Sequence, residues 1–287
     1  MGMHMMLTIG KESVYGSDLP DFMVWNQVKE LPIFWKPFYS FPAAVIGGIL
    51  VPMLFALVFG FFAFRSRIKG VYFAIITQAL ALAAWLVFNR NDTNLGGTNG
   101  LTDFKQLIGY RLSEPGTQRA LYIVTVLCLG GAYLLCRWII RSRAGRVLVA
   151  VRDSEQRVVF SGYTPANYKL FVFVVAAALA GLAGMLYAPQ VGIITPAQIG
   201  VLPSLEMVIW VAVGGRGSLA GAVLGAVSVN YGRSILTNYF PELWPFILGG
   251  LFVVVVLLFP DGLIGIMRKM KDRMGTGKAA APSEGKR

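Results

Sequence analysis

Charged residues are scarce in this chain of 287 residues: Asp, Glu, Lys and Arg together make up only 14%. A soluble protein carries about 25% charged residues. Hydrophobic residues make up 56%, so the chain is expected to lie largely within a membrane. The net charge of +12 fits the basic cytoplasmic loops of membrane proteins and does not imply a nucleic-acid partner.

Groups that carry chemistry are also rare. Cys128 and Cys136 fall in one apolar segment and are interpreted as small buried residues, and His4 has no metal-ligating residue at a useful spacing. The sequence contains no HExxH, GxSxG or Walker phosphate-loop motif, so neither catalysis nor a bound cofactor or metal is expected. No series of acidic residues indicates a proton relay, which argues against an ion-coupled carrier.

Long apolar segments dominate the chain instead. A helix needs about 20 residues to cross a bilayer, and segments of this order occupy residues 41–64, 71–88, 121–140, 170–189 and 243–259. Two shorter segments, 201–213 and 218–235, flank a glycine-rich turn and are expected to cross as a pair or to form a re-entrant hairpin. The predicted fold class is all-α, a polytopic transmembrane helical bundle. Its domains are a transmembrane domain at 1–266 and a basic, disordered cytoplasmic tail at 267–287.

The distribution of basic residues predicts the orientation of these segments. Residues 65–69 hold three basic residues and no acidic one, and residues 137–169 hold seven basic residues against two acidic ones. The polar stretches 10–41 and 89–119 are balanced in charge. Because basic loops stay in the cytoplasm, the segment 141–169 and the C-terminus are predicted to be cytoplasmic.

Three polar features are candidates for function. The segment 141–169 mixes valine with arginine in an amphipathic helical pattern, which suits either a lipid surface or a cleft of a cytoplasmic partner; Asp153 and Glu155 favour the partner. The Gly- and Asn-rich loop 94–100 suits a small uncharged polar solute, or is a flexible connector. Glu206 is interpreted as an intramembrane functional acid or as a helix-end carboxylate, with Arg216 in the following turn.

Four stretches, in order along the chain, resemble the branched-chain amino acid ABC permease family: GVYFAIITQA at 70–79, GGTNGL at 96–101, GRVLVAVRDSE at 145–155 and GGRGSLAGAVLGA at 214–226. The resemblance implies the fold of an ABC importer permease in the bacterial inner membrane, and a transport subunit rather than an enzyme. It implies as partners, besides membrane lipid, a second homologous permease, two ATPase subunits that bind the ATP, and a periplasmic binding protein.

The same resemblance implies roles for particular residues. Those of the cytoplasmic segment would couple the permease to the ATPases: Gly145, Arg146, Arg152, Asp153, Glu155 and Gly162. Gly162 is further expected to end the segment in a turn, which a β-branched residue would block if the glycine has a positive φ. Candidates for the translocation path lie in the spans and the polar loops: Thr77, Gln78, Gly97, Thr98, Asn99, Glu206 and Arg216.

Within the family, GLTDFK at 100–105 and the Thr77-Gln78-Ala79 sequence resemble the urea permease branch. Urea or a short amide is therefore the expected solute, delivered by a urea- or amide-binding protein. The alternative is import of branched-chain amino acids, which as zwitterions require charged groups on the path. Residues 1–9 reach only about 13 Å as a helix, against an apolar core of about 30 Å. Because family members have further spans before this point, the first helices are expected to be missing from the chain.

Overall fold

The computed structural model describes residues 1–9, 19–20, 23–24, 30–66, 70–90, 97–102, 104–215, 217–243, 246–247, 249–250, 253–254, 262 and 264–265. The chain divides into two compact units, Met1–Gly200 and Val201–Arg287, which are described separately. Within the described residues, five helices are long and apolar enough to cross a membrane. The predicted all-α, polytopic architecture is confirmed.

Four of these helices belong to the first unit and follow the predicted segments: α3 (Phe41–Arg65), α4 (Val71–Asn89), α5 (Pro115–Arg141) and α8 (Pro165–Val191). Helices α3, α5 and α8 each carry a proline in the first turn, where a backbone N–H has no helical partner to lose. Gly192 ends α8 in the left-handed conformation, with φ of 78°. Proline and glycine thus mark the ends of these helices, and in α5 and α8 they lie outside the predicted apolar segments.

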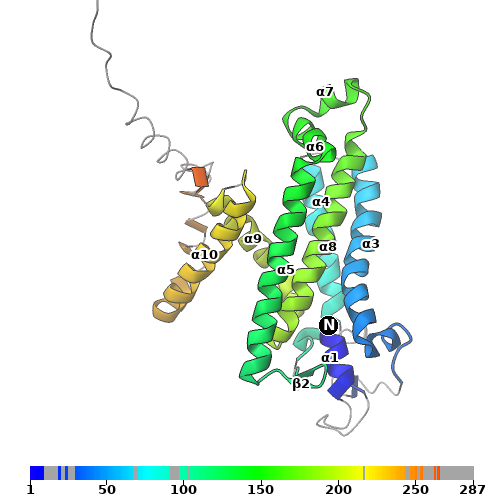
Figure 1. Ribbon diagram of the computed structural model, residues 1–287, viewed down its shortest axis with the longest axis vertical. Helices are drawn as coiled ribbons and strands as arrows, with labels where there is room; N and C mark the ends of the chain where they lie inside the picture. Colours follow the sequence, from blue (N-terminus) through cyan, green and yellow to red (C-terminus); the bar gives the residue numbers. More distant parts are fainter. Residues whose placement is uncertain are drawn as a thin grey trace, which may run out of the picture. The chain divides into compact units, whose positions relative to one another are not determined.

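Helices α3 and α8 lie side by side in the first unit (Figure 1). Phe173 of α8 contacts the rings of Phe59 and Phe64 of α3, with centroid distances of 6.2 and 5.7 Å. Farther along, an added Cβ at Gly181 would meet the carbonyl oxygen of Gly48. Small residues therefore let the two backbones approach closely.

Short elements cover one end of these helices: α1 (Gly2–Ile9), the 3-10 turns η2 (Lys36–Tyr39), η4 (Gly97–Asn99) and η5 (Pro196–Ile199), and the hairpin of β1 (Gln106–Leu107) and β2 (Tyr110–Arg111). Met5 and Met23 are fully buried here. His4 is 3% exposed, and its Nδ1 lies 2.8 Å from the carbonyl oxygen of Phe38. The histidine has a packing role, and α1 belongs to a folded cap.

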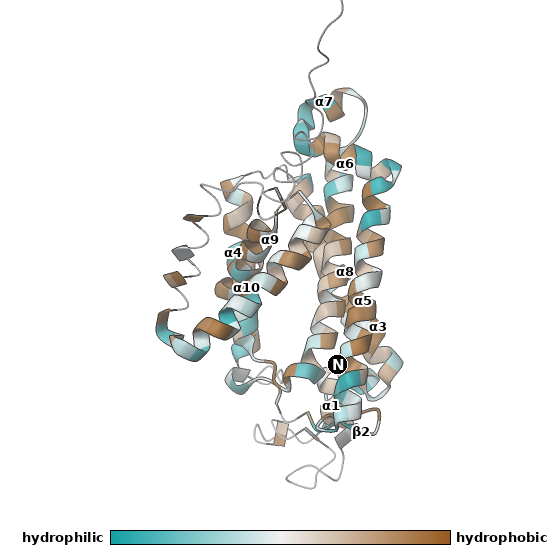
Figure 2. Ribbon diagram, turned by 60° about the vertical axis from the view of Figure 1, so that its left-hand side comes forward, coloured by the Kyte–Doolittle hydropathy of each residue, from teal (hydrophilic) through white to brown (hydrophobic). Residues whose placement is uncertain are grey.

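The opposite end carries two short helices, α6 (Arg143–Asp153) and α7 (Glu155–Phe160), which connect α5 to α8 (Figure 1). In Figure 2 hydrophobic residues predominate along α3, α5 and α8, whereas hydrophilic residues gather on α6 and α7. This contrast is the one expected of membrane spans that are joined by a polar segment.

The second unit contains α9 (Val201–Gly214), α10 (Leu219–Tyr239) and the 3-10 turn η6 (Pro241–Leu243). Helix α9 has 14 residues and so reaches only about 21 Å, too short to cross the apolar core, whereas α10 is long enough. The predicted segment 243–259 is described only in part. The predicted tail at 267–287 lies outside the described residues.

Candidate functional site

The cytoplasmic segment predicted at 141–169 begins with a tight corner between α5 and α6. Ser142 ends the first helix and begins the second: its Oγ donates to the carbonyl oxygen of Ile139 (2.7 Å) and accepts from the Gly145 N–H (3.2 Å). Gly145 is buried, and an added Cβ would lie 2.6 Å from the carbonyl carbon of Ile140. The corner therefore requires a residue without a side chain.

The segment is two helices, because the backbone extends at Ser154, with φ of −160° and ψ of 98°. Val151 and Val158 are buried, one from each helix. Glu155 Oε2 lies 2.9 Å from Lys169 Nζ, an ion pair that ties α7 to the first turns of α8. Of the two acidic residues predicted to contact a partner, Glu155 therefore also has a structural task within the chain.

Gly162 follows α7 with φ of 84°, the condition under which a β-branched residue would block this turn. Its N–H donates to the carbonyl oxygen of Val159 (3.0 Å), and the N–H of Tyr163 donates to that of Val158 (3.2 Å). These two bonds form a Schellman motif, which closes the C-terminus of a helix. Nothing lies within 4 Å of an added Cβ at Gly162, so its requirement for glycine is one of backbone conformation.

The outward surface of α6 and α7 combines charge with one prominent apolar group. Arg146, Arg152 and Asp153 are exposed, and Asp153 pairs with its neighbour Arg152 at 3.0 Å. Phe160 is 90% exposed and Val159 is 54% exposed. Sequence reasoning missed Phe160, although an aromatic residue that ends an amphipathic helix is a recognisable signal.

The polar loop candidates lie at the opposite end of the first unit. Gly97 is buried, whereas Thr98 and Asn99 are exposed. The residues that follow are fixed in place, because Leu101 and Ile194 form two backbone hydrogen bonds of 2.8 Å with each other. Gly100 has a positive φ of 69° and packs directly against the backbone of Ile194. The loop is therefore joined to the chain that follows α8.

Thr77 and Gln78 lie in the middle of α4, about 18 Å from its end near the loop at 1.5 Å per residue. The Thr77 hydroxyl donates within its own helix, at 3.1 Å to the carbonyl oxygen of Phe73 and 2.9 Å to that of Ala74. Gln78 is exposed. The structure thus does not bring these two residues together with Thr98 and Asn99.

The hairpin of the second unit contains an ion pair between its two helices. Glu206 Oε2 of α9 accepts from Arg233 Nη1 of α10 at 2.9 Å, and the two side chains are 21% and 46% exposed. Sequence reasoning identified Glu206 but missed Arg233, although an ionisable residue inside an apolar segment marks a candidate site. Arg216, the other predicted path residue, lies outside the described residues.

Close backbone packing holds the same hairpin together. An added Cβ at Gly225 would meet the carbonyl oxygen of Trp210, and one at Gly221 would lie 2.8 Å from that of Gly214. Ile209, Ala212, Val213 and Val229 form its buried core. The hairpin therefore has a tightly packed base that does not depend on its charges.

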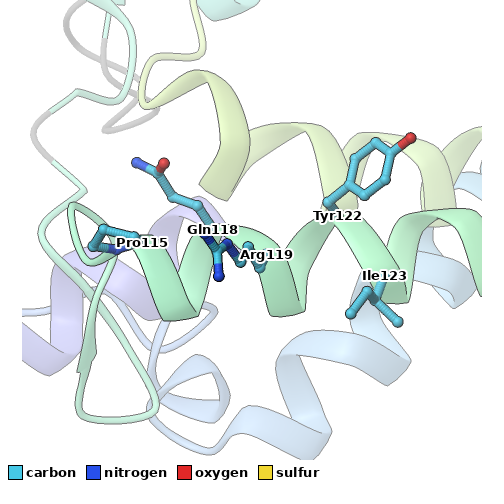
Figure 3. A pocket seen from close by; sticks show the side chains of 5 residues that line it. All are labelled: Pro115, Gln118, Arg119, Tyr122 and Ile123. Carbon is cyan, nitrogen blue, oxygen red and sulfur yellow. The ribbon is translucent and has the colours of Figure 1, made fainter.

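An open depression lies at the N-terminal end of α5 (Figure 3). It is lined by Pro115, Gln118, Arg119, Tyr122 and Ile123. Gln118 is engaged, since its Nε2 donates to the carbonyl oxygen of Leu112 at 3.3 Å. All five residues come from one helix and do not converge on a point, so the depression does not enclose a ligand. Among the described residues, no group of three or more His, Cys, Asp or Glu side chains is placed to hold a metal ion.

Comparison with known proteins relates this arrangement to a transport family. The family described as "Branched-chain amino acid transport system / permease component" matches residues 9–256. The chain is 25% identical over 308 residues to the high-affinity branched-chain amino acid transport system permease protein LivM of Escherichia coli, which covers 98% of this chain and 69% of that protein.

Two further relatives carry similar descriptions. Identity is 32% over 152 residues to the permease protein BraD of the same kind of system in Pseudomonas aeruginosa, covering 52% of this chain and 47% of BraD. Identity is 25% over 245 residues to a probable branched-chain amino acid transport permease protein LivM of Methanocaldococcus jannaschii, covering 78% of this chain and 70% of that protein. No solved structure matches the chain. Because the family match extends over most of the chain and its apolar helices fit a permease, the chain belongs to the branched-chain amino acid transport permease family.

Proposed function

We propose that this permease subunit imports branched-chain amino acids across the bacterial inner membrane, using ATP that partner subunits bind and hydrolyse. It would act with a second homologous permease, two ATPases and a periplasmic binding protein. The relatives named above are described as branched-chain amino acid transport permeases, which supports this class of solute.

The α6–α7 segment carries the proposal of coupling to an ATPase. Gly145, Glu155 and Gly162 fix its conformation through the corner, the ion pair and the Schellman motif. Arg146, Arg152 and Asp153 lie on its exposed side, together with Phe160. A rigid surface with an exposed aromatic residue among charges suits a protein partner, since aromatic anchors supply much of the energy of protein interfaces.

The solute is proposed from the charges of the second unit. A zwitterion needs both signs of charge on its path, and Glu206 and Arg233 supply both within one apolar hairpin. Urea or a short amide is the second candidate, because the exposed Thr98 and Asn99 are neutral donors and acceptors that suit an uncharged polar solute. Thr77, Gln78 and Gly97 stay proposed members of the path, as does Arg216.

Uptake by the complete importer tests this function. Proteoliposomes with both permeases, both ATPases and the binding protein are expected to accumulate labelled leucine only with ATP, and excess urea should not compete. Uptake of labelled urea without leucine uptake would contradict the proposed solute.

Coupling is tested by introducing Phe160→Cys and, as a matched control, Thr98→Cys, into a chain with Cys128→Ser and Cys136→Ser. A crosslink from position 160 to an ATPase subunit is expected, and none from position 98. Labelling of position 160 from the periplasmic side alone would refute the docking role and the orientation together.

A further inference from the structure

Glu206 and Arg233 are the only acidic and basic side chains of α9 and α10. They meet at 2.9 Å between two helices that are otherwise apolar or neutral. A charged side chain within a membrane normally faces protein or a water-filled cavity rather than lipid, because hydrocarbon does not solvate it. This pair is therefore expected to face a wet or protein-lined region of the assembled importer.

A polar stripe on α10 extends the same surface. Asn230, Arg233, Ser234 and Thr237 are exposed, and their spacing of three, one and three residues places them on one face of the helix. Such a stripe is unfavourable against lipid and favourable along a hydrated path. Arg233 thus stands within a run of hydrogen-bonding groups.

The ion pair is not needed to hold α9 against α10. The close contacts of Gly214, Gly221 and Gly225 and the apolar cluster around Ile209 already bring the two backbones together. An ion pair inside a protein is also often no more stabilising than apolar residues of similar size, because both charges lose their hydration. Its presence is better explained by a task in transport.

We infer that the Glu206–Arg233 pair is a site that recognises the two charges of an amino acid in transit. The carboxylate of the amino acid would pair with Arg233, and its ammonium group would pair with Glu206. The inference rests on the proposed function, to which it adds the residues that distinguish a zwitterion from a neutral solute.

The site would select a zwitterion because Glu206 and Arg233 exchange their ion pair with each other for ion pairs with the solute. One ion pair within the protein is replaced by two between protein and solute, so no charge is left unpaired at any stage. A guanidinium group also binds a carboxylate through two parallel hydrogen bonds, which favours the solute in this exchange. Urea has no charge with which to replace either side chain, so the loss of the ion pair would not be compensated when urea enters.

Binding of labelled leucine to the permeases and ATPases in lipid nanodiscs, without the binding protein, tests this site directly. Saturable binding is expected in the wild type, weakened at least tenfold by Glu206→Gln or by Arg233→Gln. The control Arg119→Gln removes an exposed charge at the end of α5 and should bind as the wild type does. Isocaproate and isopentylamine, which carry one charge each, should compete far less well than leucine, and urea not at all.

A double substitution, Glu206→Arg with Arg233→Glu, separates recognition from stability. It re-forms an ion pair with the charges exchanged, so any loss of protein from the membrane in the single variants should be reversed. Leucine binding should not return, since the amino acid would have to reverse its orientation. Full recovery of binding would show that the pair only stabilises the hairpin, and would overturn the inference.

A conservative variant covers the case in which the neutral variants do not reach the membrane. Arg233→Lys keeps the positive charge but loses the planar guanidinium group that can form two parallel hydrogen bonds to a carboxylate, so leucine should bind about fivefold more weakly. Unchanged affinity in this variant, or no saturable binding in the wild type, would refute the inference. Leucine uptake by the wild-type importer together with unchanged binding in the variants would leave the proposed function standing and remove only this site.

Discussion

Gly145 lies at the corner between α5 and α6. For the variant Gly145→Ala, helix propensity and the structure predict opposite changes in stability. Alanine is the better helix former by about 1 kcal/mol, so propensity alone predicts that the variant is more stable. In the structure the new Cβ would lie 2.6 Å from the carbonyl carbon of Ile140 and closer still to the carbonyl oxygens of Ile139 and Ile140. These are backbone atoms, which cannot rotate away as a side chain can.

The magnitude follows from these two opposing effects. Overpacking a well-packed site costs about 1–3 kcal/mol, and an obstacle made of backbone atoms belongs near the upper value of about 3 kcal/mol. Subtracting the propensity gain leaves a destabilisation of about 2 kcal/mol, which shifts the equilibrium between closed and open corner about 30-fold. Gly145→Ala is therefore expected to loosen the whole α6–α7 segment.

Two other glycines provide matched comparisons. Gly162→Ala adds a methyl group where nothing lies within 4 Å, so its cost of about 1–2 kcal/mol comes only from the left-handed backbone. Gly130→Ala makes the same change inside α5, again with nothing within 4 Å, and should be neutral or slightly stabilising.

The assay is the fraction of detergent-solubilised permease that stays monodisperse as temperature rises. The expected order of stability is Gly130→Ala at or above wild type, then Gly162→Ala, then Gly145→Ala. Crosslinking from Phe160→Cys to an ATPase should fall in the same order. If Gly145→Ala is as stable as wild type, the tight corner and the reasoning from it are wrong.

Three further substitutions test other parts of the structure. Gly225→Leu should separate α9 from α10 and lower the yield of folded permease, measured by size-exclusion chromatography. The control Gly232→Leu, on the same helix, has open space around it and should not lower the yield. Equal yields of the two variants would contradict the hairpin packing. Gly100→Ala should abolish uptake because its Cβ would meet the backbone of Ile194. The control Gly109→Ala has a similar positive φ without a clash, so it should lower stability but leave uptake intact. Equal effects of the two variants on uptake would refute the contact between this loop and Ile194. Lys169→Gln removes the partly exposed ion pair with Glu155 and should change the midpoint of thermal unfolding only slightly, because such pairs contribute about 0–1 kcal/mol; a large loss would show that this pair holds α7 in place.

The membrane spans were predictable because their signal is local. Residues 41–64 and 71–88 are apolar over the length that a bilayer requires, and the structure forms α3 and α4 within one residue of those limits. The end of the amphipathic segment at Gly162 was predictable for the same reason, since a glycine followed closely by a proline ends a helix; the value of its φ, 84°, comes from the structure.

The candidate sites were less accessible to sequence reasoning. Glu206 stood out as an acid in an apolar segment, but its partner is 27 residues away and only the packing of α9 on α10 brings the two together. Glu155 is predicted to contact a partner, but the ion pair that it also forms with Lys169 appears only once α7 and α8 have packed together. In both cases the pairing depends on where a second helix lies, which no short window of sequence contains.

The sequence by itself determined that the chain is an α-helical membrane protein with a polar, basic segment between two spans, because hydropathy, charge and glycine and proline positions act through neighbouring residues. Only the tertiary structure decided that this segment is two helices joined at Ser154, that Gly145 is required by a clash rather than by a turn, and that Arg233 neutralises Glu206. These features arise from contacts between elements, where a difference of a few tenths of an ångström decides whether a side chain fits. Distances of that kind exist only once the chain has folded.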